Sequence, residues 1–198
     1  MRFITNTSTA SLVIFAVTLG FGVTAQAESA VAGKYKIDPA HTSAEFSIGH
    51  LGISNLVGRF NTIEGEINLV PNGKSDVNVT IQTASIDSNH QKRDEHLKGP
   101  DFFNSKQFPT MRFVSSKASF SATGELTRVD GDLELHGVKK PISLNVKPIG
   151  AGKDPWGGYR SGYSATTTIK RSDFGMNFMP GGIGDDVTIT LQVEAIKQ

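Results

Sequence analysis

The chain has 198 residues, of which 20 are basic and 19 acidic, and it has no cysteine. This near-neutral balance argues against the nucleic-acid-binding class, which needs a basic face to neutralise phosphates, and provides no polybasic attraction to anionic lipid. Without cysteine there are no disulfides, so stability must come from packing and from a well-closed hydrogen-bond ladder.

The first 27 residues have the pattern of a secretory signal peptide. Arg2 is the only charge before Glu28, and residues 12–23 form a mostly apolar run that is too short to span a bilayer. The small residues Ala25 and Ala27 predict cleavage after Ala27, which would leave a secreted protein without stable membrane insertion. An uncleaved anchor is the alternative, although no basic stop-transfer segment follows. The mature chain, residues 28–198, is expected to form one domain with 19 basic and 19 acidic residues.

From residue 44 onward, most segments alternate apolar and polar residues, which is typical of strands with one solvated face. Turn residues separate these segments at 71–74, 122–124, 136–137 and 150–152. Short connections imply antiparallel neighbours, and about eight strands of about ten residues are enough to close a barrel. A β-sandwich is the competing architecture. The predicted strands cover residues 44–48, 60–70, 77–81, 111–120, 129–135, 142–146, 163–169 and 187–195.

The polar segment between residues 85 and 103 interrupts this alternation. It predicts one short helix around 89–98, which Ser88 or Asn89 would cap and which residues 99–100, Gly-Pro, would end. Leu97, Phe102 and Phe103 would seat this helix as a lid on a barrel mouth. We therefore expect an all-β antiparallel barrel with one helical lid, and barrels of that kind commonly hold one small apolar ligand.

Patterns of catalytic and metal-binding residues are absent from the sequence. It has no cysteine nucleophile, no Gly-x-Ser-x-Gly elbow and no HExxH or HxH spacing. His90 and His96 would lie about 240° apart around a helix, so they cannot share a metal. A zinc site assembled from distant positions stays an alternative, and Asp185-Asp186 is interpreted as a pair of solvated charges. We expect no enzyme activity, no cofactor and no metal, and a hydrolase or metalloenzyme is the least supported class.

The apolar faces of the predicted strands define the expected interior. Each such residue is most simply a part of a close-packed core. Taken together, these residues could instead line an apolar tunnel, in which burial of a hydrocarbon would contribute about 0.8 kcal/mol of binding free energy per CH₂. The only tryptophan, Trp156, is interpreted as a plug that closes one barrel end, with a ligand-facing aromatic as the alternative. The residues expected to line the lumen are Phe46, Ile48, Leu51, Phe60, Ile67, Val79, Ile81, Phe113, Leu133, Leu144, Ile169, Ile189 and Leu191, and His50 and Arg93 are expected to make polar contacts at the mouth.

A set of motifs spread over the chain carries a family resemblance. The set consists of Tyr35-Lys-Ile-Asp-Pro-Ala-His41 and residues 46–54, 58–60, 85–89, 93–97, 101–103, 108–113, 131–141 and 173–175. Together and in this order they resemble the YceI-like family of bacterial secreted proteins, over nearly all of residues 35–198.

The resemblance implies a lipocalin-like extended barrel in the periplasm that binds a polyisoprenoid chain, such as an isoprenoid quinone or a prenyl phosphate. It implies no settled catalytic activity and no catalytic residues. The first expectation is thus a periplasmic carrier of an isoprenoid lipid. The alternative is a stress-induced extracytoplasmic protein that acts by protein–protein contact, with its barrel packed solid. A homodimer is left open.

Overall fold

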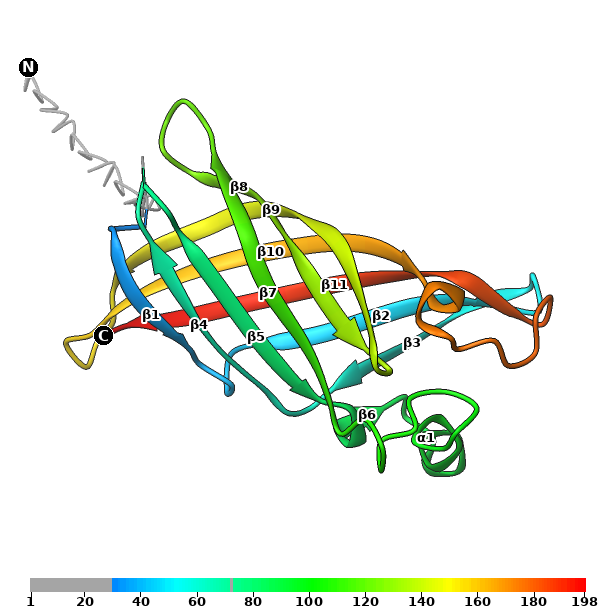
Figure 1. Cartoon of the computed structure of the whole chain (residues 1–198). Helices are drawn as coiled ribbons and strands as arrows, with labels where there is room; N and C mark the ends of the chain where they lie inside the picture. Colours follow the sequence, from blue (N-terminus) through cyan, green and yellow to red (C-terminus); the bar gives the residue numbers. More distant parts are fainter. Residues whose placement is uncertain (1–29, 72) are drawn as a thin grey trace, which may run out of the picture.

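The computed structural model describes residues 30–198 except Asn72, so the expected signal peptide at residues 1–27 lies outside the described residues. Strands make up most of the described chain (Figure 1). Its one α-helix is α1 (Gln91–Leu97), and two 3₁₀ turns are η1 (Thr83–Ser85) and η2 (Arg171–Phe174). The strands are β1 (Gly33–Ile37), β2 (Ser43–His50), β3 (Ser54–Phe60), β4 (Ile63–Leu69), β5 (Asp76–Gln82), β6 (Ile86–Asp87), β7 (Thr110–Phe120), β8 (Leu126–Leu135), β9 (Val138–Lys153), β10 (Tyr159–Lys170) and β11 (Ile183–Lys197).

Strand β1 closes the sheet into a barrel because it pairs with β4 on one side and with β11 on the other. The closed ring contains eight antiparallel strands in the order β1-β4-β5-β7-β8-β9-β10-β11. Closure of this kind removes the exposed edges that an open sheet would leave. The expected all-β antiparallel barrel of about eight strands, with one short helical lid, is confirmed.

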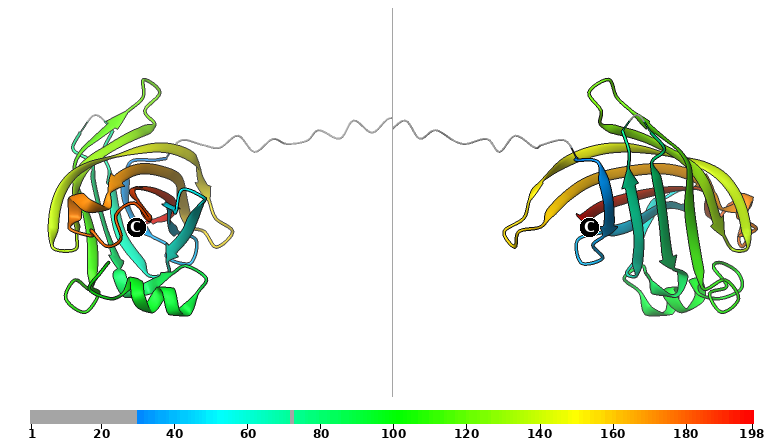
Figure 2. Two further views of the ribbon diagram at one scale, coloured as in Figure 1. Left: turned by 90° about the vertical axis from the view of Figure 1, so that its right-hand side faces the viewer. Right: turned by 60° about the vertical axis from the view of Figure 1, so that its left-hand side comes forward.

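The hairpin of β2 and β3 extends one end of the barrel beyond the closed ring. Strand β11 pairs with β1 through residues 195–197 and with β2 through residues 187–192. Strands β1 and β2 therefore lie one after the other along the same edge of β11. The β2–β3 hairpin then projects outward, beside the loop between η2 and β11 (Figure 1). Helix α1 and its flanking turns lie at the same end, as the left view of Figure 2 shows. We call this end the mouth.

Away from the mouth, apolar side chains form a core inside the barrel. Tyr35, Val129, Tyr163 and Ala195 are each at most 4% exposed and belong to one continuous core cluster. The hydroxyl of Tyr35 donates to the carbonyl oxygen of Val31 at 2.5 Å. Such burial is the main source of stability in a chain without disulfides.

Several boundaries differ from those expected. Residues 60–70 are not one strand, because the backbone N–H groups of Asn61 and Thr62 donate to Ser85 and separate β3 from β4. Residues 150–152 do not form a turn but continue β9, paired with β10, because neither glycine there has the positive φ that a tight turn requires. The alternation of apolar and polar residues had predicted neither β1 nor most of β3.

The turn between β9 and β10 lies two residues later and holds Trp156. The Asp154 carboxylate accepts hydrogen bonds from the N–H groups of Trp156 and Gly158, and Gly157 adopts a positive φ of 89°. The Trp156 side chain is 80% exposed, and its ring centroid lies 5.7 Å from the Arg160 guanidinium carbon. The interpretation of Trp156 as a plug is therefore wrong, and so is the alternative of a ligand-facing ring, since it does not line the cavity described below.

Helix α1 is shorter than expected and begins after a different cap. His90 takes the N-cap position, where its Nδ1 accepts a hydrogen bond from the Arg93 N–H at 3.3 Å. Ser88 instead lies buried between β6 and the helix, and Asn89 has a positive φ of 62°. Within the described residues, no helix is long and apolar enough to cross a membrane.

Candidate functional site

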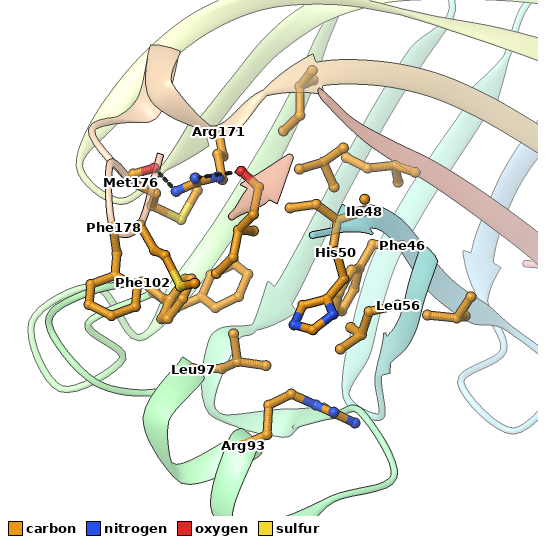
Figure 3. A pocket seen from close by; sticks show the side chains of 18 of the residues that line it. Phe46, Ile48, His50, Leu56, Arg93, Leu97, Phe102, Arg171, Met176 and Phe178 are labelled. Carbon is orange, nitrogen blue, oxygen red and sulfur yellow. Dashed lines mark hydrogen bonds between the residues drawn. The ribbon is translucent and has the colours of Figure 1, made fainter. Parts of the chain in front are cut away.

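An apolar cavity of about 640 Å³ opens at the mouth (Figure 3). Strands β2, β3 and β11 supply most of the strand residues of the lining, and β7, β8 and β10 supply one residue each. The rest comes from the lid, which we define as residues 91–103, from η2 and from the segment between η2 and β11. A volume of this size is typical of pockets for small organic ligands. The apolar lining consists of Phe46, Ile48, Leu56, Val57, Phe60, Leu97, Phe102, Phe103, Met111, Leu135, Ile169, Met176, Phe178, Met179, Ile183, Val187 and Ile189.

Three aromatic rings in contact line the inner part of the cavity. Phe46 and Phe60 have ring centroids 5.9 Å apart, and Phe60 meets Phe103 of the lid edge-on at 5.4 Å. Phe46 lies over Gly58, its partner on β3, and any Cβ at position 58 would overlap the ring. The glycine is therefore needed to seat Phe46 against the sheet.

Hydrogen bonds to the buried Ser88 hold the lid against β6. The Asp94 carboxylate accepts from both the backbone N–H and the hydroxyl of Ser88. Arg93 donates from Nη2 to the Ser88 carbonyl oxygen at 2.6 Å and from Nε to the Ser88 hydroxyl at 2.8 Å. The helix is thus fixed at its first turn, and its Leu97 side chain lines the cavity.

An aromatic cluster joins the lid to the loop between η2 and β11. The His96 ring lies edge-to-face with Phe102 at 5.1 Å and with Phe178 at 5.2 Å, and the last two rings are 5.4 Å apart. His96 Nε2 lies 2.9 Å from the Asp101 carboxylate. Edge-to-face contacts of this kind contribute about 0.5–1.5 kcal/mol each beyond their burial. All three rings line the cavity, so the cluster forms a part of its wall in which the lid and the loop are in contact.

Arg171 shapes the wall formed by that loop. Its side chain is buried, and its guanidinium donates to the carbonyl oxygens of Met176, Ile183 and Gly184 at 2.6, 3.1 and 2.8 Å. Among the described residues, no carboxylate forms an ion pair with it. Nearby, the N–H and hydroxyl of Ser172 donate to the Asp185 carboxylate, and they lower its pKa. Asp185 thus joins η2 to the start of β11, whereas Asp186 forms an ion pair with Lys170 at the surface.

The structure brings part of the predicted site together. Phe46, Ile48, Phe60, Ile169 and Ile189 line the cavity, and so do both residues expected at its mouth, His50 and Arg93. In Figure 3 the His50 and Arg93 side chains lie on the same side of the cavity, near Leu97. The chemistry that these two residues perform toward a ligand stays a prediction.

The remaining predicted lumen residues lie elsewhere. Leu51 is 49% exposed in the turn between β2 and β3, so its placement in the lumen is corrected: the strand has already ended at His50. The others pack in or against the core, away from the cavity, because the middle of the barrel is filled by side chains from all its strands. They are Ile67, Val79, Ile81, Phe113, Leu133, Leu144 and Leu191.

Several lining residues had not been predicted. Leu56, Leu135 and Val187 continue apolar faces of strands, so the alternation contained a signal for them. Met176, Phe178, Met179 and Ile183 lie in or beside an irregular loop that has no periodicity to read.

A second cluster of titratable groups lies away from the cavity. Oxygen and nitrogen atoms of Asp38, His41 and Glu194 come within 4.8 Å of one another, which is a spacing that a metal could use. Arg160 Nη1 already lies 2.6 Å from both Asp38 and Glu194. The guanidinium thus occupies the place of a cation, and this cluster is interpreted as an ion-pair network.

Known proteins resemble this chain both in sequence and in structure. The family model of the YceI-like domain matches residues 35–195. A UPF0312 protein from Shewanella denitrificans is 43% identical over 173 residues, covering 84% of this chain and 89% of the relative. The crystal structure of Burkholderia cenocepacia BcnA aligns with a TM-score of 0.70 at 21% identity, covering 80% of this chain and 98% of the other. A polyisoprenoid binding domain from Saccharophagus degradans, implicated in plant cell wall breakdown, aligns with a TM-score of 0.64 at 15% identity, covering 83% and 98%.

Proposed function

The chain belongs to the YceI-like family, and we propose that it is a lipid-binding protein that carries a polyisoprenoid chain in the cavity at the barrel mouth. The apolar lining of that cavity is the observation that carries the proposal. Burial of a hydrocarbon contributes about 0.8 kcal/mol per CH₂, so ten carbons would contribute roughly 8 kcal/mol before the entropy losses of binding. The polyisoprenoid binding domain from Saccharophagus degradans, which shares the fold, supports the choice of ligand class.

The ligand is proposed to be an isoprenoid quinone or a prenyl phosphate with its head group at the opening. His50 and Arg93 line that side of the cavity and offer hydrogen-bond donors to a carbonyl or phosphate oxygen. The proposed location is the periplasm, reached through the signal peptide expected at residues 1–27. No step of catalysis is proposed.

Native mass spectrometry of protein isolated from the cell envelope tests this function. The expected result is a bound mass that organic extraction removes and that fragments as an isoprenoid. The variant Ile189→Trp fills the cavity and should lose the ligand, whereas Thr188→Trp, on the outer face of the same strand, should retain it. Protein that never carries a lipid, even after incubation with ubiquinone, would overturn the proposal.

The alternative function, contact with another protein through a solid barrel, is less well supported. It requires a filled interior, and the cavity at the mouth does not meet that requirement. The alternative would be favoured if the wild-type protein carries no ligand and a strain that produces the Ile189→Trp variant behaves as the wild-type strain does.

A further inference from the structure

We propose that the rim of the mouth docks on a lipid bilayer, so that the isoprenoid passes between membrane and cavity without crossing water. The rim is defined as residues 51–53, the turn between β2 and β3, together with residues 175–182 of the loop before β11. This inference rests on the proposed function and names the partner from which the ligand is taken.

The two segments that form the rim lack formal charge. Residues 46–58 and residues 174–184 contain no Asp, Glu, Lys or Arg. Charged residues make up 20% of the whole chain, so two such stretches at one end of the barrel stand out. A charged side chain on the tip would resist entry into the headgroup and acyl boundary, and its absence removes that cost.

Large apolar side chains on the rim face solvent. Leu51 is 49% exposed, Ile53 84%, Phe178 37% and Met179 46%. Soluble proteins seldom gather such residues without a partner surface. Aliphatic and aromatic side chains on a protruding tip are the kind that insert a short distance into a bilayer.

The two loops form one surface. The N–H of Leu51 donates to the carbonyl oxygen of Gly182 at 2.7 Å, and Ile183 pairs with His50 at the start of β11. Figure 1 shows both loops extending together past the closed part of the barrel, at the end opposite the turn that carries Trp156. Their exposed side chains would therefore reach a membrane at the same time.

The rim is continuous with the cavity. Phe178 and Met179 are exposed to solvent and also line the cavity, and Val57 on β3, 60% exposed, does the same. A hydrocarbon that leaves the cavity would thus meet apolar side chains all the way to the tip. If the tip lies in a bilayer, this path ends in lipid.

A bilayer fits this surface better than a second copy of the chain. The exposed side chains belong to two loops that project from the barrel in Figure 1 rather than to a flat face, and a two-fold interface needs a self-complementary patch. Tips of this shape can enter between lipid headgroups without a matching groove. Because the rim carries no Lys or Arg, we expect binding to depend on apolar contact and to change little with salt.

Flotation with vesicles of equal parts phosphatidylethanolamine and phosphatidylglycerol tests the docking. The wild type should float with the vesicles at low and at high salt. Ile53→Asp should lower the affinity about tenfold or more, since it removes one inserted apolar side chain and adds a charge. The matched control Ile149→Asp changes the same residue type, 59% exposed on β9 and outside the cavity lining, and should leave flotation unchanged.

Tryptophan fluorescence tests the orientation. The chain has a single tryptophan, Trp156, in the turn between β9 and β10, which lies at the end of the barrel opposite the mouth (Figure 1), so its emission should not shift when vesicles are added. Ile53→Trp in a Trp156→Phe background should shift to the blue on vesicles. No shift at position 53, or equal shifts at both positions, would overturn the proposed orientation.

Failure of docking and failure of the carrier function give different results. Protein that holds an isoprenoid by native mass spectrometry yet neither floats nor shifts would overturn docking and leave the carrier proposal standing. A dimer by light scattering that Ile53→Asp converts to a monomer, without vesicle binding, would overturn docking in favour of a second copy. Vesicle binding that Ile53→Asp abolishes, in protein without any isoprenoid, would support the rim as a lipid-binding surface and overturn the carrier function instead.

Discussion

Arg171 donates from Nη1 to the carbonyl oxygen of Met176 at 2.6 Å, from inside the wall of the cavity. Its two other bonds reach the carbonyl oxygens of Ile183 and Gly184, at the other end of the same loop. One buried cation therefore holds both ends of the loop that carries Phe178. The loop has little regular structure of its own, so its shape depends on this side chain.

Arg171→Met should destabilise the fold and loosen the cavity wall. The change removes the three hydrogen bonds that these carbonyl oxygens receive from Arg171, and we expect the free energy of unfolding to fall by about 3 kcal/mol. Urea denaturation measures this loss. The neighbouring Lys170→Met, at an exposed side chain, should change it by less than about 1 kcal/mol. Equal effects of the two substitutions would contradict the role of Arg171.

Gly58 should tolerate no side chain as long as Phe46 keeps its place. A methyl group at position 58 would overlap the Phe46 ring and push it toward the cavity. We expect Gly58→Ala to cost about 1–3 kcal/mol of stability and to weaken ligand binding. Gly152→Ala, in open space on β9, is the control and should be neutral or slightly stabilising.

A double substitution separates this contact from a general effect on the strand. Phe46→Leu shortens the side chain that the new methyl group meets, so the pair Gly58→Ala and Phe46→Leu should be less destabilising than the sum of the two single changes. Strict additivity in a double-mutant cycle would show that Phe46 is not the cause.

The sequence predicted which residues of each strand face the barrel interior, but not where along the barrel axis each of them lies. Ile48 and Ile81 alternate equally well, yet Ile48 lines the cavity and Ile81 lies in the packed core. Alternation has a period of two and carries no information on where along the barrel axis a residue comes to lie. That position depends on register and on the way β2 and β3 leave the closed ring, which are long-range pairings.

Turns and loops account for most of the other differences. Leu51 follows directly after β2 and is out of phase with the apolar face formed by Ala44, Phe46 and Ile48, and the chain turns there with a φ of 54° and exposes it. Trp156 lies in a turn whose hydrogen bonds to Asp154 point the ring outward, and composition alone could not predict this. Residues 175–182 form part of the cavity wall, and hydrogen bonds from Arg171 hold this segment in place. No local sequence motif predicts these hydrogen bonds.

Release of the ligand should depend on the contact between Asp94 and Ser88. Asp94→Ala removes the acceptor of two hydrogen bonds that hold the lid at its first turn. If this contact contributes about 1.4 kcal/mol to the closed lid, release should become about tenfold faster. Transfer of a fluorescent isoprenoid from the protein to excess vesicles measures the rate. Glu95→Ala, on the exposed face of the same helix, is the control, and an unchanged rate in Asp94→Ala would exclude lid opening as the slow step.

The ion-pair network at Asp38 should make stability depend on pH only in strong acid. Hydrogen bonds from Arg160, and then from His41, lower the pKa of Asp38 from 3.8 to about 2. Because the folded state binds this proton more weakly than the unfolded state, the stabilisation is complete above about pH 4 and is lost as the pH falls toward 2. Asp38→Asn should therefore lower the free energy of unfolding at pH 7 by about 1–2 kcal/mol, less than the full shift implies because Arg160 is partly exposed. Denaturation curves of the two proteins should converge as the pH is lowered from 4 to 2, and a difference that stays constant over that range would show that the carboxylate charge is not what stabilises the fold.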